Sequence, residues 1–133
     1  MSSLCAIAVI VSLAACGGSD STASPATTGG AEYEIVTDAQ VTAGLADVTQ
    51  VMSTLSGLLA QDQDQARAAI ETMYTRWFEF EGTIRANDKN LYLDMEDGLV
   101  AAKIGVQENR PNKIDEGVAA FAAATSAYLL VHP

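Results

Sequence analysis

The spacing of the apolar residues constrains the fold of this chain more than any other feature. Between Val41 and Leu59, apolar side chains recur at alternating intervals of four and three residues, and the same spacing returns between Ala66 and Ile84. Shorter series of this kind run from Tyr92 to Val106 and from Ile114 to Tyr128. Such spacing places the apolar side chains of each stretch on one face of an α-helix. The sequence therefore predicts four amphipathic helices.

Polar connections separate the four stretches. They supply residues that are common at helix starts. These are Thr37 or Asp38, Asp62 and Asp64, Asn87-Asp88, and Asn109 to Asn112 with Pro111 in the first helical turn. Helices of about 20 residues are roughly 30 Å long, and short connections make neighbours antiparallel. We expect an all-α domain over residues 37–131, folded as an up-down-up-down antiparallel four-helix bundle.

A different pattern occupies the start of the chain. Leu4 to Ala15 form an apolar run of about a dozen residues, whereas a helix needs about 20 residues to cross a bilayer. The length fits the apolar region of a signal peptide. The run ends in the sequence Leu13-Ala14-Ala15-Cys16-Gly17. Both cysteines, Cys5 and Cys16, precede the predicted helices, so they do not frame a disulfide scaffold or a four-ligand zinc site.

The sequence around Cys16 resembles the lipobox of bacterial lipoproteins. The resemblance implies that residues 1–15 are a signal peptide, that cleavage occurs before Cys16, and that acyl chains such as palmitate are attached to this cysteine. Two or more acyl chains give stable membrane anchoring. The rest of 16–36 is rich in Gly, Ser and Thr and is predicted to be a flexible linker. The expected location is the extracytoplasmic, periplasmic face of the cell membrane or outer membrane.

The charge balance narrows the possible partners. The chain has 17 acidic and 7 basic residues, which give a net charge of −10. An excess of this sign repels phosphate backbones, so we expect no nucleic-acid binding. A solvated acidic surface is the simplest interpretation, and cations or basic partners are the alternatives.

Two glutamates stand out beside the predicted core. Because the second and third predicted helices are antiparallel about Asn87-Asp88, Glu81 and Glu96 fall within about one turn of each other, beside Trp77 and Tyr92. Two such carboxylates repel by about 1 kcal/mol when exposed and by more when half-buried. A proton, a bound cation or one of three side chains could compensate, these being Arg85, Lys89 and Tyr74. A salt bridge or solvated acidic edge is the more common outcome, and an oxygen-ligated hard-cation site is the alternative.

The same region carries a resemblance. Trp77, Glu81, Ile84-Arg85, Asp88, Tyr92 and Glu96 follow the pattern W-x-x-x-E-x-x-I-R-x-x-D-x-x-x-Y-x-x-x-E. It resembles the extracytoplasmic helical segment of bacterial high-affinity iron permeases and is loosely similar to the imelysin-like iron-uptake lipoproteins. The similarity covers roughly residues 73–121 and implies iron as a candidate ligand. The permeases' membrane-embedded acidic motif and the imelysin-like histidine and glutamate motif are absent, so no transport or peptidase role follows.

Catalytic groups are not apparent in the sequence. The single histidine, His132, stands next to the last residue, and we find no Ser-His-Asp grouping and no Gly-rich phosphate loop. We therefore expect no enzyme and no certain cofactor. The favoured function is a membrane-anchored binding or accessory module that contacts an envelope protein. The alternative is a metal-binding accessory protein of an iron-uptake system, acting with an iron permease through Glu81 and Glu96.

Overall fold

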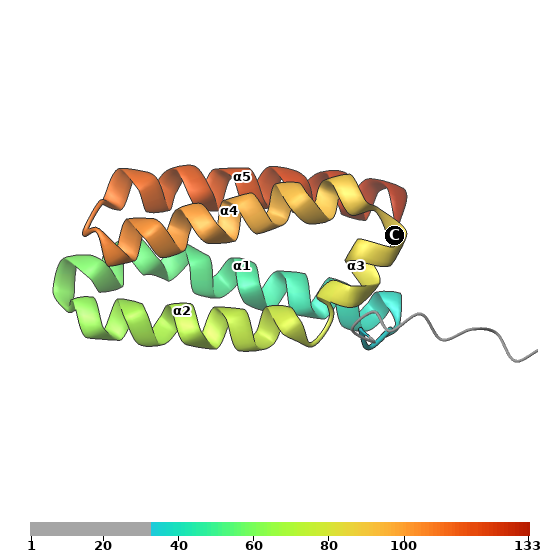
Figure 1. The fold of residues 1–133 in the computed structure, drawn as a ribbon, viewed down its shortest axis with the longest axis horizontal. Helices are drawn as coiled ribbons and strands as arrows, with labels where there is room; N and C mark the ends of the chain where they lie inside the picture. Colours follow the sequence, from blue (N-terminus) through green and yellow to red (C-terminus); the bar gives the residue numbers. More distant parts are fainter. Residues whose placement is uncertain (1–32) are drawn as a thin grey trace, which may run out of the picture. The chain divides into compact units, whose positions relative to one another are not determined.

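The computed structural model of the chain describes residues 33–133, and this part is all-α (Figure 1). Its five helices are α1 (Asp38–Gln61), α2 (Gln63–Phe78), α3 (Glu81–Asn87), α4 (Lys89–Gln107) and α5 (Pro111–Val131). No strand occurs among residues 33–133. The predicted signal peptide, Cys16 and most of the predicted linker lie outside the described residues.

The four longer helices lie side by side, and consecutive ones run in opposite directions (Figure 1). α1 packs against α2 and α5, and the most extensive contact joins α4 to α5. The short helix α3 lies where α2 ends and α4 begins. α1 starts and α5 ends at this same end, which we call the α3 end (Figure 1).

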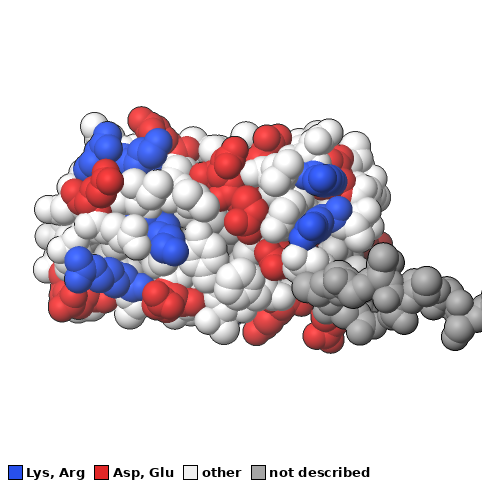
Figure 2. All heavy atoms as spheres, in the orientation of Figure 1, with Lys and Arg blue, Asp and Glu red and all other residues white. Residues whose placement is uncertain are grey.

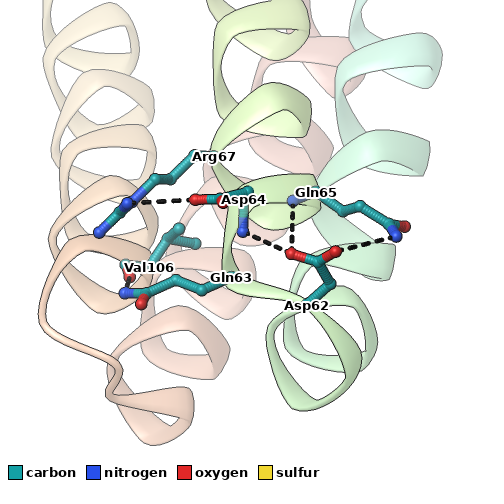
Figure 3. Close-up of polar contacts among 6 residues, drawn as sticks. All are labelled: Asp62, Gln63, Asp64, Gln65, Arg67 and Val106. Carbon is teal, nitrogen blue, oxygen red and sulfur yellow. Dashed lines mark hydrogen bonds and ion pairs between the residues drawn. The ribbon is translucent and has the colours of Figure 1, made fainter.

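Three helix starts follow from local capping chemistry predicted from the sequence, and Pro111 stands in the first turn of α5. Thr37 forms a capping box with Gln40 at the start of α1. The Asp62 carboxylate accepts the backbone N–H groups of Asp64 and Gln65 at 2.8 and 3.3 Å (Figure 3). Asp88 does the same at the start of α4. Each cap satisfies donors that the first helical turn leaves free.

The core contains every apolar position predicted for the first two stretches. These buried residues are Val41, Leu45, Val48, Met52, Leu55, Leu59, Ala66, Ile70, Met73, Trp77, Phe80 and Ile84. The periodicity of the sequence therefore identified the buried face of the N-terminal half of the fold.

The expected second helix is wrong in one respect, because it is two helices. α2 ends at Phe78 and α3 begins at Glu81. The reason is a tertiary contact: the Phe80 ring fills the space beside Gly44 of α1, where an added Cβ would lie 2.3 Å from ring carbons. Gly82 also weakens helix propensity there. The break leaves both Phe80 and Ile84 buried, so apolar spacing alone did not reveal it.

The expected face of the last helix is also partly wrong. Val118 and Thr125 are only half-buried, whereas Gly117 and Ala124 are buried. Backbone proximity explains the difference. A Cβ on Gly117 would lie 2.5 Å from the Gly98 carbonyl oxygen and 2.6 Å from the Ala102 nitrogen. α4 and α5 therefore meet through small residues, which a pattern of large apolar side chains does not mark.

Among the described helices, only α5 is long and apolar enough to span a bilayer by length and composition. A core helix of a soluble protein satisfies the same criterion. Five of its residues are buried against the other helices: Ile114, Gly117, Phe121, Ala124 and Tyr128. In this structure α5 is part of the packed core.

Candidate functional site

The two glutamates predicted to be neighbours lie in one cluster with Trp77 and Tyr92. The indole Nε1–H of Trp77 donates a hydrogen bond to the Glu96 carboxylate. The Trp77 and Tyr92 rings stack with centroids 6.1 Å apart and an interplanar angle of 14°. Trp77 is fully buried, and a buried indole needs a partner for its N–H group. Glu96 supplies that partner from α4.

Three helices position these side chains. Trp77 comes from the last turn of α2, Glu81 is the first residue of α3, and Tyr92 and Glu96 stand one turn apart on α4. The break at Phe80 determines where Glu81 lies, because the anchored Phe80 ring immediately precedes it. As a result Glu81 is only 9% exposed, although it begins a helix.

Burial is the main influence on the Glu81 carboxyl. Loss of hydration raises its pKa above the ordinary value of 4.5, and the neighbouring Glu96 carboxylate raises it further. The side chains of Trp77, Arg85 and Tyr92 act in the opposite direction, with less effect. Burial and the neighbouring carboxylate therefore both oppose ionisation of Glu81.

Two tyrosine hydroxyls respond to the same environment. Burial raises the pKa of Tyr74 to about 12, and the Glu96 carboxylate adds to the increase. The pKa of Tyr92 is also raised to about 12, by burial first and then by Glu96 and Glu81. Both hydroxyls therefore keep their protons at neutral pH and are available as hydrogen-bond donors.

Arg85, one of the compensating groups considered from the sequence, lowers the pKa of Glu81. Its guanidinium carbon lies 4.7 Å from the ring centroid of Tyr33 and 5.8 Å from that of Tyr92. It also donates a hydrogen bond to the Tyr33 hydroxyl. Both ring contacts are cation–π contacts. Lys89, also considered as a compensating group, is exposed at the start of α4.

Residues 33–36, which the sequence places at the end of a flexible linker, instead contact α3 on this side. The Val36 backbone N–H donates to the Thr83 hydroxyl at 2.8 Å. At Gly82 an added Cβ would lie 2.5 Å from the Cβ of Tyr33 and 2.9 Å from the Glu34 carbonyl oxygen. The available signal was Gly82 itself, since a glycine inside a predicted helix often marks a close backbone approach.

The two carboxylates of the cluster can bind a proton or a cation. Glu79, Asp94 and Asp97 are exposed. Within residues 33–133, no three acidic, histidine or cysteine side chains come together in a way that could hold a metal ion. A hard cation here would take two carboxylates from the chain and complete its shell with other oxygens, including water. The metal role of Glu81 and Glu96 stays a prediction.

Two further features lie outside the cluster. The His132 ring stacks on Tyr128 with centroids 4.6 Å apart. Between α1 and α5, a groove of about 490 Å³ is lined by residues that include Leu45, Thr49 and Leu129. The Thr125 hydroxyl oxygen beside it is buried and has no hydrogen-bond partner among the described residues.

The fold and the site define an all-α protein in which a buried glutamate, Glu81, lies beside the half-buried Glu96 at an aromatic stack. No family model matches the sequence, and no curated protein or solved structure matches it significantly.

Proposed function

We propose that the chain is a membrane-anchored extracytoplasmic lipoprotein. Its helices serve as a non-catalytic binding or accessory module, arranged as an up-down-up-down four-helix bundle in which α3 is part of a connection. The observation that carries the proposal is the sequence Leu13-Ala14-Ala15-Cys16-Gly17 after a short apolar run. A cysteine in this context accepts acyl chains, and two or more such chains keep a soluble domain at a membrane.

The position of the helices is compatible with this function. The core begins at Val41 and ends at Tyr128, well after Cys16 in the sequence. The residues that follow Cys16 are mostly Gly, Ser and Thr, a composition typical of linkers. The expected partners are the membrane itself and an envelope protein that docks on an exposed face of the helices.

Lipid labelling in cells tests the anchor. A bacterial host expressing the full chain is fed a clickable fatty acid, and the purified protein is analysed for attached label. We expect labelling of the wild type, complete loss in Cys16→Ser, and retention in the matched control Cys5→Ser, because Cys5 lies within the predicted signal peptide. Labelling that persists in Cys16→Ser would refute the anchor.

A second candidate function is supported by the acidic pair. Glu81 is buried beside Glu96, and two neighbouring carboxylates favour a positive ion between them. Hard cations prefer carboxylate oxygens. The alternative proposal is therefore a metal-binding accessory protein of an uptake system, with iron as the candidate ion and an iron permease as the candidate partner.

Thermal unfolding with added metal tests this alternative. Ferrous iron and manganese, each at about 100 times the dissociation constant, should stabilise the fold by about 2.7 kcal/mol. A domain of this size would then melt roughly 10 °C higher. Glu81→Gln combined with Glu96→Gln should abolish the increase, whereas Glu79→Gln, which changes an exposed acid nearby, should preserve it. An equal increase in all three proteins would show that the metal binds elsewhere.

A further inference from the structure

Exposed large apolar side chains gather at one end of the helical unit. Of seven such residues within 33–133, six lie at the α3 end: Tyr33 and Ile35 before α1, Phe78 at the end of α2, Leu93 near the start of α4, and Leu130 and Val131 at the end of α5. The seventh, Val100, lies farther along α4. Single exposed apolar residues are ordinary, but their concentration in one region marks an interaction surface.

Several of these apolar side chains are mostly exposed to solvent, whereas the connections at the opposite end carry polar residues. Leu130 is 83% exposed, Ile35 63% and Phe78 62%. At the opposite end, the connection between α1 and α2 carries the polar capping network of Asp62 (Figure 3). The connection between α4 and α5 carries Glu108 to Arg110, which are exposed and polar. The exposed large apolar residues are therefore concentrated at the α3 end, where they stand among charged side chains such as Glu34, Asp38 and Lys89, and the opposite end has none of them.

The path of the chain indicates which end of the helical unit lies nearer to the predicted lipid anchor. Tyr33, the first described residue, belongs to the α3 end, where it contacts Gly82 and Arg85 of α3. Cys16 precedes Tyr33 by a segment, residues 17–32, that even fully extended reaches at most about 60 Å. α1 alone is about 36 Å long. A lipid attached at Cys16 therefore holds the α3 end nearer to the bilayer, on average, than the opposite end.

We propose that the α3 end is a membrane-contacting surface whose apolar side chains enter the boundary between lipid headgroups and acyl chains. This inference rests on the proposed lipid anchor, which raises the local concentration of the α3 end at the bilayer. The favoured surface is a neutral phospholipid. The chain carries a net charge of −10, and its basic side chains stand in small separate groups on the face drawn in Figure 2. Anionic headgroups attract clusters of basic residues, whereas apolar contact does not depend on lipid charge.

Lipid photocrosslinking with an artificial anchor tests the surface directly. A chain lacking residues 1–15 keeps the whole described core and has Cys16 as its single cysteine. This thiol is coupled to a maleimide lipid in phosphatidylcholine vesicles that also contain a phospholipid with an acyl-chain diazirine. After illumination, mass spectrometry locates the crosslinked peptides. We expect crosslinks at Tyr33 to Val36 and at Leu129 to Val131, and none at Gln61 to Gln65.

Two variants test whether crosslinking depends on the exposed apolar side chains of the α3 end. The triple variant Ile35→Ser, Leu130→Ser, Val131→Ser should reduce crosslinking at the α3 end roughly tenfold, because it removes apolar area that leaves water on contact. The matched control Val100→Ser, also exposed but in the middle of α4, should crosslink like the wild type. All four positions are exposed, so circular dichroism should show an intact fold in each protein.

Three outcomes would overturn the inference. One is equal crosslinking at both ends of the helical unit, and another is a triple variant that crosslinks like the wild type. The third is a dimer in analytical ultracentrifugation that the triple variant abolishes, with no lipid crosslinks in the wild type, because a second copy would then cover the α3 end.

Acylation of Cys16 in cells together with no crosslinks would refute this surface alone. Crosslinks in the coupled protein without acylation in cells would refute only the natural anchor.

Discussion

Glu81 and Glu96 lie at the same aromatic stack, but they differ in hydrogen bonding and in burial. Glu96 accepts the Trp77 N–H, while Glu81 is more deeply buried and has a raised pKa. A buried ionised carboxylate without full compensation is costly, so its proton is retained to a higher pH. Stability should therefore depend on pH through Glu81.

The sign of this dependence follows from the direction of the shift. The pKa of Glu81 is higher in the folded state than its ordinary value of 4.5. Its contribution to stability is present below that ordinary value and is lost as the pH rises through the folded-state pKa. Glu81→Gln cannot ionise, so its free energy of unfolding should rise relative to that of the wild type over this window.

Urea denaturation at a series of pH values measures the difference. Glu79→Gln is the control, because Glu79 is exposed and its replacement should give a curve parallel to that of the wild type. Parallel curves for Glu81→Gln and the wild type would mean that Glu81 ionises as freely in the fold as in the unfolded chain.

One part of this site is predictable from the sequence and another part is not. Positions on two antiparallel helices can be paired by counting outward from the connection, which is why Glu81 and Glu96 were expected to be neighbours. The contacts of Tyr33 with Gly82 and Arg85 could not be found in this way. They depend on the path of the irregular segment before α1, and the periodic spacing of apolar residues does not predict the path of such a segment.

At the scale of helices, the period of the sequence identified buried faces better than helix ends. Phe80 and Ile84 continue the spacing of the second stretch, yet a break lies between Phe78 and Glu81. Tertiary packing of the Phe80 ring beside Gly44 overrides the local preference. In α5 the same reasoning favoured Val118 and Thr125 because they are larger than the glycine and alanine that are buried instead.

Two glycine substitutions test the close contact of α4 and α5. Gly117→Ala places a Cβ 2.5 Å from the Gly98 oxygen and 2.6 Å from the Ala102 nitrogen, both backbone atoms that cannot rotate away. The helices must separate, so we expect destabilisation by about 1–3 kcal/mol despite the better helix propensity of alanine. Chemical denaturation measures the change.

The matched control is in α1. Nothing lies within 4 Å of a Cβ added at Gly57, so Gly57→Ala should stabilise the protein by about 0.5–1 kcal/mol. A Gly117→Ala protein as stable as Gly57→Ala would mean that α4 and α5 are held farther apart than the structure has them.

At the scale of the whole molecule, the all-α class follows from the sequence because four stretches each have one apolar face. Such faces are buried only against each other, and short connections leave few ways to do so. The concentration of exposed apolar residues at the α3 end was not visible in the sequence. Ile35, Phe78 and Leu130 are far apart along the chain, and the fold alone brings them to one end.

The attachment of the first described residues to α3 has a mechanical consequence. Tension transmitted along the chain from the direction of Cys16 arrives at Tyr33 and is borne first by its contact with Arg85 and by the Val36–Thr83 hydrogen bond. Both contacts are on α3, the helix that begins with Glu81. A pull applied before Tyr33 would therefore load α3 before the first turn of α1, so the first helix to bear it is the one that begins with the buried Glu81.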